Sequence, residues 1–359
     1  MRESARHSRS ARVRTEARAC RVRGCAQAAC QAAAWQAARA TLALCLGLGC
    51  ALVSAFDLQG HRGARGLAPE NTIAGFELAL ELGVDTLELD VGVTRDDVAV
   101  VFHDRRLNAD LVRDGSGRWL DGPGPPIRAL ELHALREFDV GRLRPGSAYA
   151  AAHPAQRPLD GARIPTLAEV LALAKRPGGE RIRFNVETKL SPLAPHETAD
   201  PETFARVVVE TVRAAGVADR TTVQSFDWRT LRTVRRLAPE IALAYLSSAR
   251  PGFDTVGATD PSGVSAWTDG LRFADHGSVP RLVRAAGGTL WSPNARDLDT
   301  AALAEARSLG LAVVPWTVND AALMRRLVEW GVDGLITDRP DLLHEVLVER
   351  GLRRPRAAR

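Results

Sequence analysis

The sequence predicts a protein of the α/β class, a closed (β/α)8 barrel, and three observations support this expectation. Short apolar runs alternate with helical patterns from Phe56 onward, which is typical of the βα units of a parallel sheet. Eight such units follow one another, and eight is the number that closes a barrel. Polar residues follow many of the apolar runs and no GxGxxG follows any of them, which disfavours an open doubly wound sheet.

The helices expected between the strands have ordinary start and stop signals. The first, for example, should begin after Asn71 or Thr72 as N-cap and end before Gly83. We expect strands at 56–60, 86–91, 182–188, 221–226, 241–246, 289–292, 312–317 and 334–337, and helices at about 73–82, 165–174, 201–215, 228–237, 279–286, 299–309, 320–330 and 341–350.

The second strand should be followed by a β-hairpin instead of a helix. The six residues 92–97 (GVTRDD) are too few for a helical crossover, so the next apolar run should return antiparallel. A two-residue turn at Asp96 and Asp97 would place Asp90 directly opposite His103.

Residues 104–163 interrupt the alternation. They are rich in Gly, Pro, Asp and Arg, with one helical segment at about 130–138. Such a long irregular stretch inside a compact domain indicates an insertion, which we interpret as a small capping subdomain or an extended loop system over the site. The barrel is then expected to span 56–350, followed by a basic tail at 351–359.

Residues 1–55 form an Arg-rich leader that differs from the rest of the chain. The leader carries nine Arg against two Glu, whereas the remainder carries 39 Lys and Arg against 41 Asp and Glu. The basic pI therefore gives no case for a nucleic-acid partner. All five cysteines precede residue 51, so the body has neither a disulfide framework nor a thiolate metal site.

The leader ends in an apolar segment, residues 40–56. Small residues at Val53, Ser54 and Ala55 are typical of a signal-peptidase site. We therefore expect a signal cleaved near Ala55, a periplasmic or secreted protein, and no stable membrane span in the mature chain. A retained membrane anchor is the alternative, which the shortness of the segment disfavours; an organelle transit peptide and a spurious upstream start stay open.

Three carboxylates are expected to meet at the mouth of the barrel, because polar side chains at the carboxyl ends of barrel strands converge there. They are Glu88, Asp90 and Glu187, of which the first two share a face of their strand. Clustered carboxylates repel one another unless a cation neutralises them. Oxygen ligands favour Ca²⁺ or Mg²⁺ over zinc, so we expect one divalent cation; salt bridges to rim arginines are the alternative.

Two histidines and two cations should join these carboxylates. His61 and His103 could exchange protons near neutral pH as a general acid and base. Arg62 offers a planar fork for phosphate oxygens, and Lys189, one of only two lysines in the chain, offers a point charge. This assembly suits displacement at a phosphodiester; capping or core histidines are the alternative.

The chain resembles the glycerophosphodiester phosphodiesterase family in seven motifs, in order between about Phe56 and Pro340. They read HRGARGLAPENT, ELDVGVTRD, VVFHD, NVETK, QSF, WTVN and GLITDRP. The resemblance implies a TIM barrel with a hairpin insertion, a divalent cation, and hydrolysis of glycerophosphodiesters such as glycerophosphocholine or glycerophosphoethanolamine to sn-glycerol 3-phosphate and an alcohol, a step of phospholipid degradation. It further implies attack by the neighbouring glycerol hydroxyl, through a cyclic phosphate that water opens.

The resemblance also implies roles for individual residues. Glu70 is expected behind the metal ligands or as a metal-side carboxylate, with a helix N-terminal charge as the alternative. Trp316 is expected to pack against the glycerol, or else in the core. Asp97 departs from the family, which usually has Gly in this turn. The remaining roles are the acid/base pair (His61 and His103), the metal ligands (Glu88, Asp90 and Glu187) and the phosphate contacts (Arg62 and Lys189).

Two rival functions stay open. One is a phospholipase D-like or C-like enzyme acting on lysolipid or intact lipid head groups, which would need apolar surface on the insertion. The other is a non-catalytic binding or scaffold protein, which would have lost at least one of the site residues. The sequence leaves open the alcohol group, the choice between Ca²⁺ and Mg²⁺, and the oligomeric state.

Overall fold

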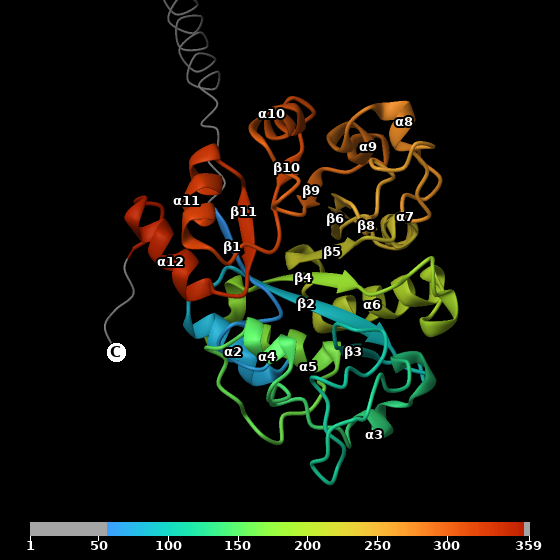
Figure 1. The fold of residues 1–359 in the computed structure, drawn as a ribbon, viewed down its shortest axis with the longest axis vertical. Helices are drawn as coiled ribbons and strands as arrows, with labels where there is room; N and C mark the ends of the chain where they lie inside the picture. Colours follow the sequence, from blue (N-terminus) through green and yellow to red (C-terminus); the bar gives the residue numbers. More distant parts are fainter. Residues whose placement is uncertain (1–55, 355–359) are drawn as a thin grey trace, which may run out of the picture. The chain divides into compact units, whose positions relative to one another are not determined.

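A nearly closed barrel of eight parallel strands forms the centre of the structure, a computed structural model that describes residues 56–354 (Figure 1). The predicted fold class is thereby confirmed. The leader and its expected cleavage site lie outside the described residues, as do residues 355–359. Around the barrel the strands follow the order β10-β9-β6-β5-β4-β2-β1-β11. Their bounds are β1 (Asp57–Gly60), β2 (Thr86–Val93), β4 (Arg183–Thr188), β5 (Thr221–Ser225), β6 (Ala242–Ser247), β9 (Leu290–Pro293), β10 (Ala312–Val313) and β11 (Gly334–Thr337).

Backbone hydrogen bonds close the barrel between β10 and β11. Asp333 N–H donates to Val313 O at 2.9 Å, and Ile336 N–H donates to Pro315 O at 3.1 Å. β10 was expected to reach residue 317 but ends at Val313. Pro315 has no N–H to donate to a neighbouring strand, although its carbonyl still helps to close the barrel and Trp316 N–H donates to Pro293 O of β9 at 3.0 Å.

The helices lie outside the strands and begin where the sequence places their caps (Figure 1). Thr72 Oγ1, for example, accepts from Gly75 N–H at 3.1 Å and so caps the first helix. The bounds are α2 (Ile73–Glu81), α5 (Leu167–Leu171), α6 (Pro201–Ala215), α7 (Trp228–Leu237), α9 (Val279–Ala285), α10 (Thr300–Ser308), α11 (Ala321–Trp330) and α12 (Pro340–Glu349), with 3-10 turns at Ile127–Ala129, Ala172–Lys175, Gly179–Arg181, Pro195–Glu197 and Ala218–Arg220.

One apolar core joins the strands to these helices. Leu58 and Leu87 of the barrel and Phe76 and Phe204 of the helices are completely buried in it. Across the described residues, no helix is both long and apolar enough to span a bilayer.

The hairpin after β2 is present, but its predicted register was wrong by one residue. β3 (Ala99–Val101) pairs antiparallel with β2, and Val91 stands opposite Val101. Asp90 is consequently paired with Phe102, whose N–H donates to Asp90 O at 2.9 Å, and not with His103.

The turn explains the slip. The hairpin closes at Thr94 and Val98, so three residues form the loop in place of two. The last of them, Asp97, has a φ of +57°. A three-residue loop ending in a left-handed residue is a common hairpin connection, but Gly usually marks it. With Asp at that position, the sequence carried no clear signal for the loop length.

Residues 104–163, called here the inserted subdomain, have an apolar core of their own beside the hairpin. Leu107 and Leu135 are completely buried in this core, which also includes Val100 of the hairpin and the adjoining Ile164. The expected helical segment corresponds to α3 (Leu132–Leu135), and a second short helix, α4 (Ala148–Ala152), was not foreseen. The irregular stretch 249–278 similarly holds small elements, namely β7 (Ala249–Arg250), β8 (Phe253–Asp254) and α8 (Phe273–His276).

Leu135→Ala tests whether the inserted subdomain has a packed core. Loss of this buried side chain should cost about 2–5 kcal/mol of local stability. Limited proteolysis should then cut within 104–163 faster than in the wild type, with unchanged cleavage in the barrel. The control Leu159→Ala, at a residue 49% exposed, should change stability by less than about 0.5 kcal/mol. Equal cleavage of L135A and the wild type would contradict the packed core.

Candidate active site

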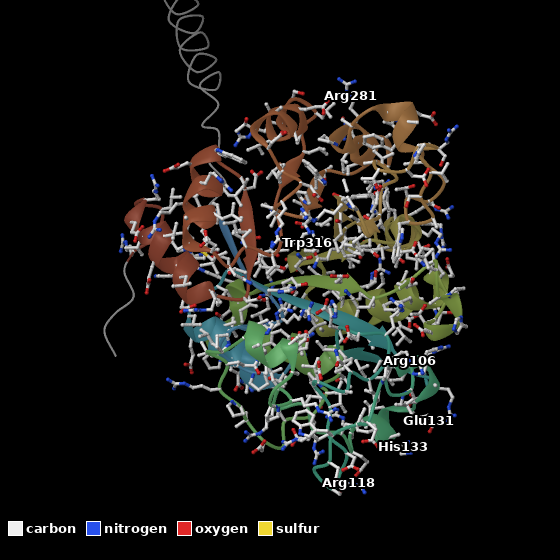
Figure 2. The ribbon with its side chains drawn as sticks, in the orientation of Figure 1. Arg106, Arg118, Glu131, His133, Arg281 and Trp316 are labelled. Carbon is white, nitrogen blue, oxygen red and sulfur yellow. The ribbon has the colours of Figure 1, made fainter. Side chains whose placement is uncertain are left out.

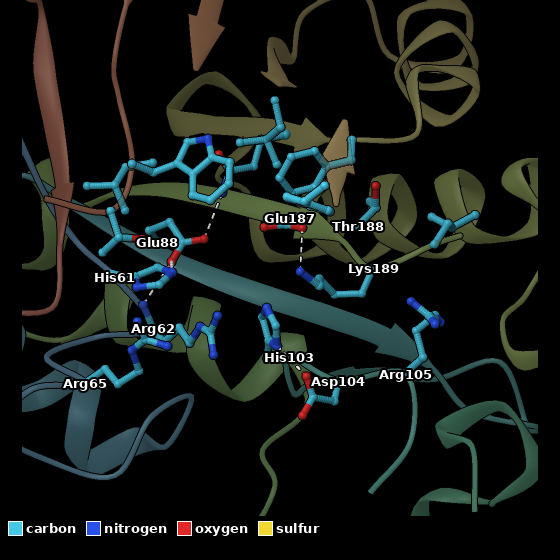
Figure 3. A pocket seen from close by; sticks show the side chains of 18 of the residues that line it. His61, Arg62, Arg65, Glu88, His103, Asp104, Arg105, Glu187, Thr188 and Lys189 are labelled. Carbon is cyan, nitrogen blue, oxygen red and sulfur yellow. Dashed lines mark hydrogen bonds and ion pairs between the residues drawn. The ribbon is translucent and has the colours of Figure 1, made fainter. Parts of the chain in front are cut away.

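A cavity of about 450 Å³ opens at the carboxyl ends of the strands, a size suited to a small molecule (Figure 3). The structure brings together at this cavity most of the residues that the sequence singled out. Asp90 lies buried with them, and Glu70 lies behind Arg62. The predicted residues that line the cavity are His61, Arg62, Glu88, His103, Glu187, Lys189 and Trp316.

The three carboxylates form one buried cluster because of strand register. Asp90 on β2 is paired with Glu187 on the neighbouring parallel strand β4. Glu88 precedes Asp90 by two residues and therefore projects from the same face. One oxygen from each carboxylate lies within 4.8 Å of the others, an arrangement that could hold a metal ion.

The charges of this cluster are unequally balanced. Burial raises the pKa of Glu88 well above its usual value, and the neighbouring Asp90 and Glu187 raise it further. Burial likewise raises the pKa of Glu187 to about 7, although Lys189 opposes this. Burial acts in the same direction on Asp90, but the nearby Arg62, His103 and Lys189 together outweigh it and lower the pKa of Asp90. Glu88 and Glu187 thus have too little positive charge nearby to offset the effect of burial on their ionised forms.

A divalent cation fits this donor set. The donors are all carboxylate oxygens, which hard cations prefer. Asp90 Oδ1 is buried and has no hydrogen-bond partner, and Lys189 Nζ lies 3.6 Å from it. An acceptor-only oxygen left in this state is costly unless a cation satisfies it.

Beneath the carboxylates, a layer of amide side chains crosses the barrel. Gln224 Nε2 donates to Glu88 Oε1 at 2.8 Å. Asn185 Nδ2 donates both to Gln224 Oε1 at 3.0 Å and to Gln59 Oε1 at 2.8 Å. These bonds fix the orientation of Glu88 from below.

Two cations flank the carboxylates. Arg62 Nε lies 3.1 Å from Asp90 Oδ2, and the Arg62 backbone N–H donates to Glu88 Oε2 at 2.9 Å. Lys189 Nζ lies 2.6 Å from Glu187 Oε1. Because both side chains also line the cavity, they present positive charge to whatever occupies it.

The loop after β1 holds Arg62 in an unusual backbone conformation, with a φ of +51°. The next residue, Gly63, has a φ of +86°, and a Cβ there would lie 2.7 Å from the backbone of Gly75. Only glycine permits this close approach of the loop to α2. The HRGARG sequence therefore builds the turn that delivers Arg62 and the preceding His61 to the cavity.

Each histidine is held through Nδ1 by a carboxylate. His61 Nδ1 lies 2.6 Å from Asp338 Oδ1, and His103 Nδ1 lies 2.6 Å from Asp104 Oδ1. Figure 3 shows the second of these pairs beside the cavity. Nε2 is left in both rings as the nitrogen that can exchange a proton with a bound molecule.

Burial lowers the pKa of both histidines. The pKa of His61 falls to about 4, because burial and the nearby Arg65 outweigh the opposing charge of Asp338. Burial also lowers the pKa of His103, and Arg62 and Lys189 reinforce this effect.

Asp338 and Asp104 are site residues to which sequence reasoning assigned no role. Asp338, at the end of β11, also accepts from Arg65 Nε at 2.8 Å and from Asn319 Nδ2 at 2.6 Å. Both aspartates stand in the recognised motifs, as the Asp of GLITDRP and of VVFHD, and that position was the available signal.

Glu70 lies outside the carboxylate cluster. Its Oε1 accepts from Arg62 Nη1 at 2.9 Å, and its Oε2 accepts from the hydroxyl of Tyr149. Burial raises the pKa of Glu70, but Arg62 and Arg65 outweigh this effect and lower it. Glu70 thus supports Arg62 from behind.

Aromatic side chains form the wall of the cavity opposite these charges. Trp316 packs edge-on against Phe226, with ring centroids 5.3 Å apart, and Nε1–H of Trp316 donates to Ser292 O at 2.9 Å. Phe253 and Trp267 also pack against Phe226 and line the cavity. Trp316 lines the cavity and lies near the middle of the molecule (Figure 2).

Known proteins share this fold and sequence. The Glycerophosphoryl diester phosphodiesterase family matches residues 61–342. A glycerophosphodiester phosphodiesterase of Bacillus subtilis (strain 168) is 29% identical over 297 residues, which cover 80% of this chain and 84% of the relative. A solved structure from Silicibacter pomeroyi DSS-3, named for the same family, has a TM-score of 0.73 at 36% identity and covers 83% of this chain and 95% of that chain.

A more distant solved structure shows the fold alone. It is an Oleispira antarctica phosphodiesterase in complex with sn-glycerol-3-phosphate, 24% identical, with a TM-score of 0.59 over 81% of this chain and 96% of that one. The fold and its site define an enzyme of the phosphodiesterase class. The chain belongs to the glycerophosphoryl diester phosphodiesterase family.

Asp90→Asn should abolish divalent-cation binding, since it removes the charge from the most buried of the three carboxylates. Isothermal titration with Mg²⁺ and with Ca²⁺ should show binding to the wild type. The affinity of D90N should be lower by at least about 10–100-fold, which is the loss seen when a residue that only supports a metal ligand is changed. The exposed Glu240→Gln serves as control and should bind like the wild type. Equal affinities of D90N and the wild type would place the cation elsewhere.

Proposed function

We propose that this chain hydrolyses glycerophosphodiesters to sn-glycerol 3-phosphate and an alcohol, with a divalent cation and histidine general acid/base catalysis. One observation carries the proposal: two histidines, each held through Nδ1 by a carboxylate, lie on one cavity with a carboxylate cluster and two cations. Membership of the family supports it.

Glu88, Asp90 and Glu187 are the residues proposed to hold Ca²⁺ or Mg²⁺. When bound, the cation supplies positive charge that offsets the negative charge developing on the phosphate. The chain's own cations act on the same group: Arg62 with a planar fork of donors and Lys189 with a compact ammonium that Glu187 holds in place. Because these charges are already in place, no reorganisation is needed as the reaction proceeds.

The two histidines divide the proton transfers. In the first step one histidine takes the proton of the neighbouring glycerol hydroxyl, whose oxygen bonds to phosphorus, while the other gives a proton to the departing alcohol oxygen. The product is a cyclic phosphate. In the second step water opens the ring and the proton transfers run in reverse, which restores both histidines.

The alternative hypothesis, a phospholipase that acts on lysolipid or intact lipid head groups, receives less support than hydrolysis of glycerophosphodiesters. A cavity of about 450 Å³ suits a deacylated diester, and the inserted subdomain has one large exposed apolar residue, Leu159.

Secretion is also a proposal, and it rests on residues 1–55 alone. N-terminal sequencing of exported protein would test the expected cut near Ala55.

His61→Ala should lower kcat by about 10²–10⁴, the usual contribution of general acid/base catalysis. Release of sn-glycerol 3-phosphate from glycerophosphocholine measures this, with and without a chelator, and the chelator should stop the wild type. His133→Ala is the matched control, because its side chain is 80% exposed and lies at the outer edge of the molecule (Figure 2). A wild type that hydrolyses no glycerophosphodiester, or H61A with full activity, would contradict the proposal.

Asp338→Asn should lower kcat by about 10²–10⁴ with little change in KM, because a neutral amide replaces the carboxylate that orients His61. Steady-state kinetics on the same substrate separate the two constants. Asp341→Asn is the control: this nearby carboxylate pairs with Arg339 and does not touch His61. Unchanged kcat in D338N would show that His61 needs no such partner.

A further inference from the structure

Part of the inserted subdomain reaches behind the arginines of the site. α4 and the residues after it contact the loop that follows β1. Arg157 N–H donates to Leu67 O at 2.9 Å, and Gln156 Nε2 donates to Arg65 O at 2.8 Å. These two bonds attach the segment to the loop that carries Arg62.

The hydroxyl of Tyr149, on α4, joins three charged groups at this contact. It accepts from Arg62 Nη1 at 3.2 Å and from Arg65 Nη1 at 3.3 Å, and it donates to Glu70. Two guanidinium groups that repel each other thus donate to one hydroxyl, which in turn donates to Glu70. All three hydrogen-bonding positions of the hydroxyl are used, so it has one orientation.

The ring of Tyr149 is itself fixed. His153, four residues on, stacks against it with ring centroids 5.0 Å apart, and His153 Nδ1 donates to Tyr149 O at 2.9 Å. His153 Nε2 lies 3.8 Å from Asp338 Oδ2. One face of the segment therefore meets both Arg62 and the aspartate that holds His61.

Arg62 depends on these contacts for its direction. On one side its Nε faces Asp90, and on the other its Nη1 faces Glu70 and Tyr149. A planar guanidinium binds phosphate through a fork whose direction must match the oxygens. A group that bonds to Arg62 Nη1 therefore sets the direction of the guanidinium without touching the phosphate.

We infer that Tyr149 of the inserted subdomain is a positioning residue for phosphate binding, acting through Arg62. The inference rests on the proposed function, in which Arg62 contacts the phosphate. It assigns to the inserted subdomain, whose role the sequence left open, the task of completing the phosphate side of the site.

Tyr149→Phe tests this inference, because it keeps the ring and removes only the hydroxyl. KM for glycerophosphocholine and Kd for inorganic phosphate should both rise about tenfold, as for the loss of a hydrogen bond to charged groups, while kcat stays within about threefold. The control is Tyr245→Phe, the only other tyrosine, whose hydroxyl bonds to Ala286 O away from the cavity. Y245F should leave KM, kcat and phosphate binding unchanged.

A second measurement separates positioning from a general structural effect. In an Arg62→Lys background, Tyr149→Phe should weaken phosphate binding by less than about twofold, because residues that act through one another are not additive. A full tenfold further loss in that background would overturn the inference, as would Y149F with wild-type KM and Kd. A Y149F that does not fold would also overturn it, since the role would then be structural.

The outcomes also distinguish the inference from the proposed function. If the wild type hydrolyses glycerophosphodiesters and Y149F matches it in every constant, only the inference fails. If the wild type hydrolyses none but Y149F still weakens phosphate binding, the proposed function fails and the inference stands. If the wild type neither hydrolyses these substrates nor binds phosphate, both fail.

Discussion

The rest of the site depends on the burial of three carboxylates at one end of the barrel. Glu88, Asp90 and Glu187 are each less than a tenth exposed, and the Arg and Lys side chains that pair with them in the described part of the chain are Arg62 and Lys189. Such a cluster is expensive to bury without further positive charge. The barrel nevertheless enforces it, because Asp90 and Glu187 are register partners on adjacent strands. A cation bound to the three carboxylates would supply the positive charge that their burial requires.

The side chains around the buried carboxylates are held in place by hydrogen bonds from several directions. Amide side chains hold Glu88 from below, while the loop after β1 brings Arg62 in from the side. Asp338 and Asp104 hold the two histidines at the cavity. Gln224, Arg62 and Asp338 come from the ends of barrel strands or the loops that follow them, which is where a barrel of this kind places its chemistry, and Asp104 follows the hairpin strand β3. The inserted subdomain adds to them from outside the barrel.

Much of the fold and of the candidate site could be predicted from the sequence, and the features that were missed have physical causes. The strands were predictable because each apolar run is bounded by caps and turns, and the charged site residues because they stand at strand ends. The hairpin register was missed because Asp97 occupies a left-handed position where Gly would have marked the turn. α4 was missed because a five-residue helix has almost no periodicity. The role of Asp338 depends on β11 lying beside β1, which only the closed barrel reveals.

The proposed mechanism requires the buried carboxylates to hold a cation beside the phosphate of the substrate. The most direct measurement is a crystal structure of the protein with Mn²⁺ and sn-glycerol 3-phosphate, in which anomalous scattering locates the ion. We expect the ion on Glu88, Asp90 and Glu187, with the phosphate in contact with Arg62 and Lys189. An ion bound elsewhere, or a phosphate away from both cations, would contradict the proposed mechanism.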